Sequence, residues 1–295
     1  LESLKSLPSP LAAEAQILTG LIVMADWIAS NPDAFPMVVS GTQTQRAEDG
    51  MRVIDLTAPW NPVHPDSDVH ALFRDSFGWP ATFHARPIQK AMADVAETCT
   101  EPSLIILEAE TGVGKTEAAL ATAQIIAASN GAQGVYFAAP TMATANGLLE
   151  RTMNWARNTT ETGSVSSLYL AHSKNQLSKP YRELRFRDVN EDAFDLSSNG
   201  DVVASSWMSG RRRGLLSNIV VGTVDQVLML ALRQPYSMLR HAALAGKIII
   251  FDEIHSYGAY ASDYLATTLE WLAHYGATVI MMSATLPSAE REKLI

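Results

Sequence analysis

Short apolar runs alternate with helical stretches over the carboxyl-terminal two thirds of the chain. The runs that predict strands are 104–109, 134–140, 167–172, 218–223, 247–253 and 277–285. They are apolar at nearly every position, as expected for strands that are covered on both faces. Helical stretches follow most of them, and such alternation favours parallel pairing. We therefore predict a doubly wound, mainly parallel α/β sheet.

The chain before residue 86 has a different pattern. An N-cap followed by proline at Ser9-Pro10 and a stop at Ser30-Asn31-Pro32 predict a helix over 9–30. Residues 36–85 mix prolines, polar residues and aromatic residues, which predicts an irregular linker that packs against its neighbours. Polar residues also interrupt the alternation at 173–217, where we expect an insertion between strands.

Composition and charge narrow the function classes. Of the 295 residues, 47% are hydrophobic, so the chain can bury a sizeable core. The net charge of −9 argues against a protein that is basic over its whole surface, although a local basic groove stays compatible with it. Cys99 is the single cysteine, which excludes an intrachain disulfide. This fits a reducing compartment such as the cytoplasm, although many secreted proteins also lack disulfides.

The predicted helix over 9–30 is the most apolar long stretch of the chain. Glu14, Gln16 and Asp26 interrupt it, which suits a buried helix better than a membrane span. No basic segment followed by an apolar run marks a signal peptide. We therefore expect no association with a membrane.

The stretch AETGVGKT, residues 109–116, nearly matches the phosphate-binding loop GxxxxGK[ST], with Ala in place of the first Gly. It follows a predicted strand and begins a predicted helix. Gly112 and Gly114 let backbone N–H groups converge on a phosphate, and the helix N-terminus adds partial positive charge. Lys115 would contact the terminal phosphates, and the Thr116 hydroxyl would bind magnesium. The alternative is a chance turn that contains glycine.

Two further motifs stand where predicted strands end. In the stretch DEIH, Asp252 would hold magnesium and Glu253 would polarise the attacking water. Its alternative is a pair of acids that caps the next helix. The stretch SAT follows the last predicted strand, where the Ser283 and Thr285 hydroxyls can contact both the acidic motif and a second ligand. Taken alone, this stretch is an ordinary Ser/Thr turn.

In this order the motifs resemble those of the first RecA-like lobe of superfamily 2 helicases. AETGVGKT resembles motif I, in which Ala at the first position is common, DEIH resembles motif II and SAT resembles motif III. The stretches 139–151 and 220–228 resemble motifs Ia and Ib, and RPIQKAM at 86–92 resembles the glutamine motif that reads adenine. The resemblance covers residues 86–295 and implies ATP binding by Gln89, Gly112, Val113, Gly114, Lys115 and Thr116, catalysis by Lys115, Asp252 and Glu253, and coupling by His255, Ser283 and Thr285.

The same resemblance implies contacts with single-stranded DNA. Thr141 and Arg151 in the motif Ia stretch, and Thr223 in the motif Ib stretch, stand where hydroxyl and N–H groups bind phosphate. Six further arginines add local positive charge: Arg182, Arg185, Arg187, Arg211, Arg212 and Arg213. A solvated face, or ion pairs with nearby acids, explains these six equally well.

Among superfamily 2 helicases, FDEIHSY with the downstream ATVIMMSATLP most resembles the CRISPR type I helicase–nucleases, in which an HD-type nuclease domain precedes the helicase. That resemblance implies that 1–35 holds the last helix of the HD domain, 36–85 the linker and 86–295 the first helicase lobe. Asp26 matches the last metal ligand of the HD motif. An acid in so apolar a stretch is costly to bury unpaired, and a metal, a hydrogen bond or exposure each removes that cost.

The resemblance implies an ATP-dependent translocase or helicase lobe that moves 3′ to 5′ on single-stranded DNA with ATP and magnesium. The whole protein would unwind and degrade target DNA in antiviral defence, with iron, manganese, nickel or cobalt at the HD site. A guide-RNA surveillance complex of the Cascade type would recruit it. One rival is another DExH helicase or a restriction-type translocase, and a second is an ATP-binding switch that does not translocate.

Overall fold

The computed structural model describes residues 12–38, 41–54, 56–63, 68–172, 175, 178–184, 201–204, 208 and 213–294. Within them a seven-stranded sheet has the order β1-β7-β6-β2-β5-β3-β4, and every neighbouring pair is parallel. The strands are β1 (Leu104–Glu108), β2 (Val135–Ala139), β3 (Val165–Ala171), β4 (Asp201–Val203), β5 (Ile219–Thr223), β6 (Ile248–Phe251) and β7 (Val279–Ser283). The predicted doubly wound parallel sheet is therefore confirmed.

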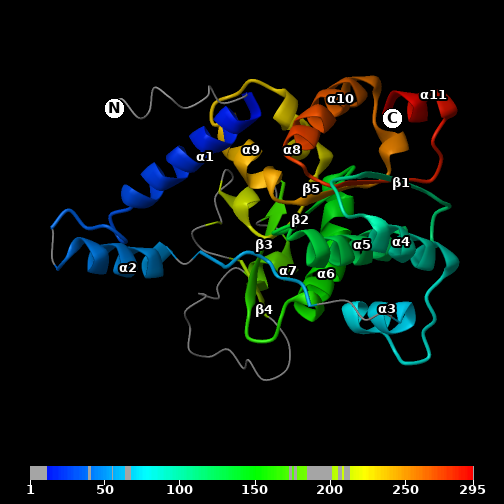
Figure 1. Cartoon of the computed structure of the whole chain (residues 1–295), viewed down its shortest axis with the longest axis horizontal. Helices are drawn as coiled ribbons and strands as arrows, with labels where there is room; N and C mark the ends of the chain where they lie inside the picture. Colours follow the sequence, from blue (N-terminus) through cyan, green and yellow to red (C-terminus); the bar gives the residue numbers. More distant parts are fainter. Residues whose placement is uncertain are drawn as a thin grey trace.

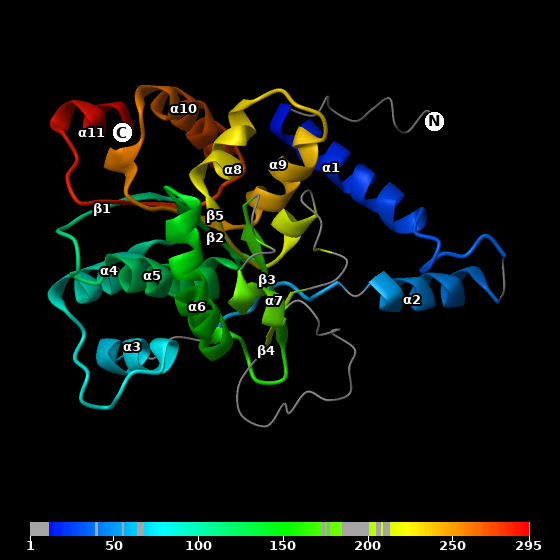
Figure 2. The same cartoon turned by 180° about the vertical axis from the view of Figure 1, so that it is seen from behind.

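Helices cover both faces of the sheet, as Figures 1 and 2 show from opposite sides. The helices α3 to α6 lie on one face, and α8, α9 and α10 lie on the other. Because both faces are covered, every residue of β2, β5, β6 and β7 is buried. The bounds are α1 (Ala12–Ala29), α2 (Gln43–Ile54), α3 (Val69–Phe77), α4 (Pro87–Thr98), α5 (Lys115–Asn130), α6 (Met142–Thr159), α7 (Lys179–Leu184), α8 (Val224–Leu228), α9 (Ser237–Ala245), α10 (Ala259–His274) and α11 (Ser288–Leu294).

The interval 173–217, which we expect to be an insertion between strands, contains regular elements that the polar sequence did not predict. Its described residues include α7 and β4, and β4 extends the sheet by pairing in parallel with β3. A strand of three residues is too short to produce a recognisable apolar run. Arg185, Arg187, Arg211 and Arg212 lie outside the described residues.

The linker 36–85 packs on the sheet domain as predicted, but it is less irregular than expected, since it contains α2 and α3. Trp60 is 3% exposed, and its ring lies 5.3 Å from that of Trp155 in α6. Phe73 of α3 is fully buried in the main core. Prolines near these helices concealed them in the sequence, because proline usually marks turns and helix ends.

The prediction that α1 is a buried helix is wrong for the described residues, because Gly20 is its only buried residue. Figures 1 and 2 show α1 lying along α9. A Cβ atom on Gly20 would lie 2.6 Å from the backbone oxygen of Met238, so the two helices meet at that glycine. By length and composition, α1 is the one helix in the described chain that could cross a membrane, and one such helix is weak evidence for a span.

The sheet order sets the position of the motifs. Because all seven strands run the same way, their carboxyl ends meet at one edge of the sheet. The strand β7 lies between β1 and β6, with Glu108 opposite Ser283 in the β1–β7 register. The motif after β7 therefore stands between the phosphate-loop sequence and the acidic pair.

Candidate nucleotide-binding site

The loop that follows β1 has the backbone of a phosphate-binding loop. Gly112 and Gly114 have φ angles of 84° and 94°, which favour glycine. A Cβ on Gly114 would also lie 2.6 Å from Nε2 of Gln89. Ala109 is not among the described non-glycine residues with positive φ. Alanine in place of the first glycine therefore brings no backbone strain, and Val113 stands between the two glycines that are required.

The Lys115 ammonium lies at the centre of this loop and is nearly buried, with 7% of the residue exposed. Its Nζ atom donates to the backbone oxygen of Ala109 at 2.6 Å and to that of Glu110 at 3.3 Å. These carbonyls hold a positive charge at the N-terminus of α5, where partial positive charge already gathers. The arrangement favours an anion such as a phosphate group at this point.

Two acids follow β6 and face the same space. Asp252 is 8% exposed, and burial, together with the neighbouring Glu253 carboxylate, raises the pKa of Asp252 to about 6. Lys115 opposes that shift without cancelling it. Two adjacent carboxylates repel each other, and a bound cation would relieve this repulsion. Magnesium prefers oxygen ligands such as a carboxylate and a hydroxyl. Asp252 and Thr116 therefore fit a magnesium ion bound together with phosphates.

Glu253 has an unusual backbone and an unsatisfied side chain. Its φ angle of 50° puts a non-glycine residue in the left-handed region. Its Oε2 atom is buried and accepts no hydrogen bond from the described residues, although Nδ1 of His255 lies 3.2 Å away. Strain of this kind persists where the surrounding structure enforces it, often at functional sites. The Glu253 side chain is 28% exposed and lines the cavity, so its carboxylate is available to polarise a water molecule there.

His255, Ser283 and Thr285 are joined in one network, as their predicted coupling role requires. The Ser283 hydroxyl donates to the backbone oxygen of Thr285 at 2.6 Å. Nδ1 of His255 lies 3.1 Å from that hydroxyl oxygen, and the Ala284 N–H donates to Nδ1 at 3.4 Å. This bond connects the segment after β6 with the segment after β7.

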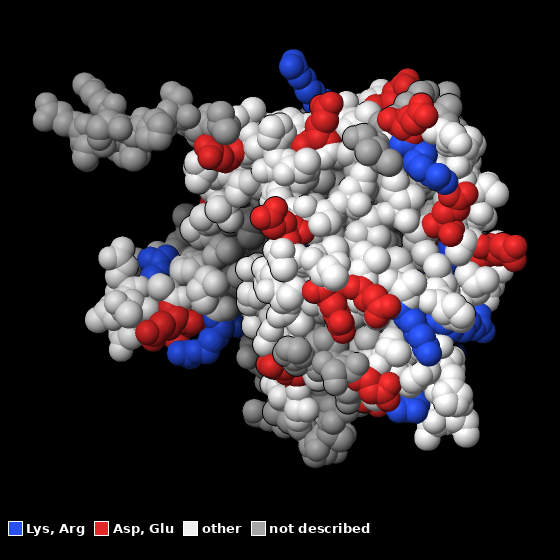
Figure 3. Space-filling model, turned by 45° about the vertical axis from the view of Figure 1, so that its right-hand side comes forward, with Lys and Arg blue, Asp and Glu red and all other residues white. Residues whose placement is uncertain are grey.

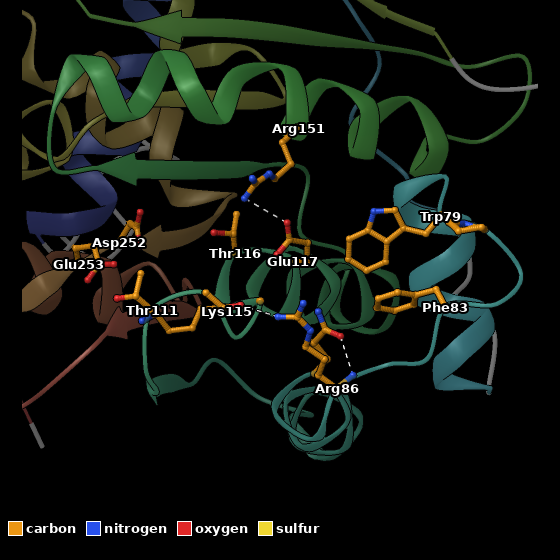
Figure 4. Close-up of a pocket in the computed structure, with 14 residues that line it drawn as sticks. Trp79, Phe83, Arg86, Thr111, Lys115, Thr116, Glu117, Arg151, Asp252 and Glu253 are labelled. Carbon is orange, nitrogen blue, oxygen red and sulfur yellow. Dashed lines mark hydrogen bonds and ion pairs between the residues drawn. The ribbon is translucent and has the colours of Figure 1, made fainter.

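The motif residues line one cavity of about 590 Å³, shown in Figure 4. Lys115, Thr116, Asp252 and Glu253 stand at one end of it, and Trp79 and Phe83 stand at the other. A volume of this order suits a nucleotide-sized ligand. The residues around the cavity are Trp79, Pro80, Phe83, Arg86, Gln89, Thr111, Gly112, Gly114, Lys115, Thr116, Glu117, Arg151, Asp252 and Glu253.

The sequence did not single out six residues that line this cavity: Trp79, Pro80, Phe83, Arg86, Thr111 and Glu117. Of the two aromatic residues, Trp79 was expected only as a packing residue of the linker, and nothing in the sequence marked Phe83. Arg86 donates through Nη1 to the backbone oxygen of Gly112 at 2.6 Å, and its backbone N–H donates to Oε1 of Gln89 at 2.9 Å. Gln89 is only 1% exposed, so it supports the phosphate loop from behind as well as lining the cavity. Arg86 stands directly before α4 and begins the RPIQKAM stretch, and this position was the signal that could have identified it.

The three residues predicted to contact DNA do not lie together. Thr141 caps α6 by accepting from the N–H of Thr144 at 3.1 Å, and Thr223 precedes α8 on the neighbouring strand end. Arg151 instead points into the cavity, where its Nη1 atom lies 3.2 Å from Oε1 of Glu117 (Figure 4). On the face shown in Figure 3, acidic side chains lie among the basic ones. The DNA contacts stay predictions.

Asp26 is exposed on α1. No group of three or more His, Cys, Asp or Glu side chains that could hold a metal occurs within the part of the chain that the structure describes. These residues alone therefore do not form the metal site expected for an HD nuclease, and the role of Asp26 as a ligand stays a prediction.

Comparison with known protein families gives two matches. The family "Type III restriction enzyme, res subunit" matches residues 82–288, and the family "Cas3, HD domain" matches residues 2–35. These are families of a helicase domain and of a nuclease domain, and together they imply use of ATP and of a divalent metal.

The chain is also similar to individual proteins. The CRISPR-associated nuclease/helicase Cas3 of Streptococcus thermophilus is 39% identical over 99% of this chain and 32% of its own length. The crystal structure of T. fusca Cas3-ATP aligns with a TM-score of 0.77 and 30% identity, covering 96% of this chain and 31% of its own. A chain of a "CRISPR RNA-guided surveillance complex, pre-nicking" shares the fold, with a TM-score of 0.59, 24% identity, and coverage of 97% of this chain and 27% of its own. The chain thus spans about a third of the length of these relatives.

Proposed function

We propose a function for this chain, which belongs to the family of the type III restriction enzyme res subunit and is a homologue of the Cas3 nuclease/helicases. It would be the lobe of the whole protein that binds and hydrolyses ATP. The energy released would move the protein along single-stranded DNA. The whole protein would unwind and degrade target DNA. The observation that carries this proposal is the convergence of Lys115, Thr116, Asp252 and Glu253 on one cavity.

At the phosphate end of the cavity, Lys115 would exchange the carbonyl oxygens that it now contacts for the β- and γ-phosphate oxygens. Thr116 and Asp252 would hold magnesium, which supplies positive charge to the phosphates when it is bound. Glu253, which lines the cavity, would accept a hydrogen bond from the attacking water and orient it.

At the other end, the rings of Trp79 and Phe83 offer apolar surface for the adenine base. Their centroids lie 4.2 Å apart, so they form one continuous aromatic wall. Gln89 and Arg86 border the same space and supply the polar groups that select the base.

We extend the proposal to DNA and to partners by relationship. Thr141 and Thr223 stand on adjacent strand ends and would contact phosphates of a single strand. The similarity to a chain of a CRISPR RNA-guided surveillance complex supports recruitment by a guide-RNA complex of the Cascade type. Asp26, in the stretch that matches the Cas3 HD family, would ligate iron, manganese, nickel or cobalt only together with ligands from outside the described residues. We place the protein in the cytoplasm.

The proposal is tested by ATP hydrolysis with and without single-stranded DNA in the full-length protein that contains this chain. Lys115→Ala should abolish the DNA-stimulated rate, because it removes the charge that binds the transferred phosphate. Lys90→Ala, at an exposed lysine on α4, is the matched control and should keep that rate. DNA-stimulated hydrolysis that survives Lys115→Ala would overturn the site. Hydrolysis without any response to DNA would favour the ATP switch instead.

A further inference from the structure

An ion pair stands in the middle of the cavity and has no role in the contacts proposed so far. Glu117 belongs to the first turn of α5 and Arg151 to α6, and Arg151 Nη1 lies 3.2 Å from Glu117 Oε1. The Glu117 side chain is 13% exposed, whereas that of Arg151 is 51% exposed. The carboxylate is thus enclosed by the cavity wall, and the guanidinium lies over it from the solvent side (Figure 4).

The two ends of the cavity fix which part of a nucleotide meets this pair. Figure 4 shows Glu117 and Arg151 between the end with Lys115 and Asp252 and the end with Trp79 and Phe83. A nucleotide with its phosphates at the first end and its base at the second has its ribose between them. Glu117 immediately follows Thr116 in the chain. In Figure 4 its carboxylate lies nearer to Trp79 and Phe83 than Thr116 does, which is the ribose side of the phosphates.

The chemistry of the pair matches a sugar better than a phosphate. An ionised carboxylate only accepts hydrogen bonds, and the two ribose hydroxyls are the donors that this part of a nucleotide offers. A bare carboxylate so close to phosphates would repel them, and the Arg151 guanidinium neutralises it. The ion pair also fixes the rotamer of Glu117, so that little conformational entropy is lost on binding.

We infer that Glu117 accepts a hydrogen bond from a ribose hydroxyl of the bound adenine nucleotide, and that Arg151 is the positioning residue that holds the Glu117 carboxylate for it. This inference rests on the proposed nucleotide site and adds selection of a ribonucleotide over a deoxynucleotide. It also gives Arg151 a role at the nucleotide in place of the contact with DNA.

The test is the affinity of this chain for ADP, 2′-deoxy-ADP and 3′-deoxy-ADP with magnesium, measured by isothermal titration calorimetry. ADP avoids hydrolysis during the measurement. Loss of a hydrogen bond to a charged acceptor should weaken binding about tenfold or more for at least one of the two deoxy analogues. In Glu117→Ala, ADP and both analogues should bind with the same affinity, close to that of the weaker analogue in the wild type.

Two more variants separate the roles within the pair. Glu117→Gln keeps an acceptor of the same size without the charge and should keep part of the preference for ADP. Arg151→Gln frees the carboxylate to move and should reduce the preference while leaving Lys115-dependent binding in place. Glu150→Ala, at an exposed neighbour on α6, is the control for mutation near the pair and should retain the full preference.

Three outcomes overturn the inference, and they are distinguishable. If the wild type binds all three nucleotides equally and Lys115→Ala still abolishes binding, the ribose contact is refuted and the nucleotide site stands. If Arg151→Gln weakens the binding of ADP and of both analogues by the same factor, Arg151 contacts a phosphate instead. No binding of ADP by the wild type removes the proposed nucleotide site itself, and the ribose contact with it.

Discussion

At the scale of single residues, the two acids after β6 each carry a cost that the fold alone does not explain. Asp252 keeps a carboxylate at a buried position, and Glu253 holds left-handed backbone that costs roughly 1–2 kcal/mol for a non-glycine residue. Neither feature stabilises the fold, but both residues place a carboxylate at the cavity that Lys115 also lines. The identity of these residues could be predicted from DEIH, but their strain and burial depend on neighbouring strands that only the folded chain brings together.

The raised pKa of Asp252 predicts that Asp252→Asn stabilises the protein in the absence of magnesium. A pKa that rises from 3.8 to about 6 on folding means that stability is lost as the pH rises from about 4 through 6. Above pH 6 the wild type keeps a buried charge that Asn lacks, so the variant should be more stable by up to about 3 kcal/mol. Urea unfolding at pH 8 and at pH 4 measures this difference.

The pH dependence serves as the internal control for this substitution. At pH 4 the carboxyl group is mostly protonated, so wild type and variant should converge. A variant that is destabilised at pH 8, or a difference that is the same at both values, would show that the Asp252 carboxylate is well compensated in the folded chain. The variant should also lose magnesium-dependent ATP hydrolysis, whatever its stability.

At the scale of elements, the fold could be predicted where strands are long and buried. Continuous apolar runs such as KIIIF predicted β6 within a residue or two, because a strand covered on both faces has no polar positions to obscure it. The short strand β4 and the helices α2 and α3 were missed, since three residues or a proline-rich context give no clear period. The same gap hid Trp79 and Phe83, which follow α3 and complete the cavity.

The contact between α1 and α9 predicts opposite effects for the same substitution at two helical glycines. Gly20→Ala adds a Cβ 2.6 Å from the Met238 oxygen and 2.8 Å from Ala242 Cβ, so it should lower the free energy of unfolding by about 1–3 kcal/mol. Gly147→Ala in α6 adds a Cβ where no atom lies within 4 Å. It should raise the free energy of unfolding by roughly 0.5–1 kcal/mol. Urea unfolding compares the two variants.

Nucleotide affinity is the control for this pair of variants. Because the cavity is lined by residues outside α1 and α9, Gly20→Ala should leave binding of a non-hydrolysable ATP analogue unchanged. If both substitutions change stability by the same amount, α1 is not held against α9 as closely as the structure has it.

At the scale of the whole molecule, the cavity is assembled from distant parts of the chain. Its residues come from the segment before α4 with the first turn of α4, the loop after β1 with the first turn of α5, the helix α6 and the segment after β6. The sequence identified three of these parts through motif order. It did not place Arg151 beside Glu117, because the contact depends on how α6 lies relative to α5 in the folded chain. A helical position alone does not tell which ligand a long side chain faces.

If Lys115 binds the phosphates of a magnesium nucleotide in this cavity, nucleotide affinity depends on both the ammonium group and the metal. Calorimetric titration of this chain with AMP-PNP, a non-hydrolysable ATP analogue, should give binding that weakens when magnesium is removed. In Lys115→Ala it should weaken by at least about tenfold, the size of a lost charge-assisted hydrogen bond, while Lys90→Ala should bind as the wild type does. Equal affinities in wild type and Lys115→Ala would contradict the account.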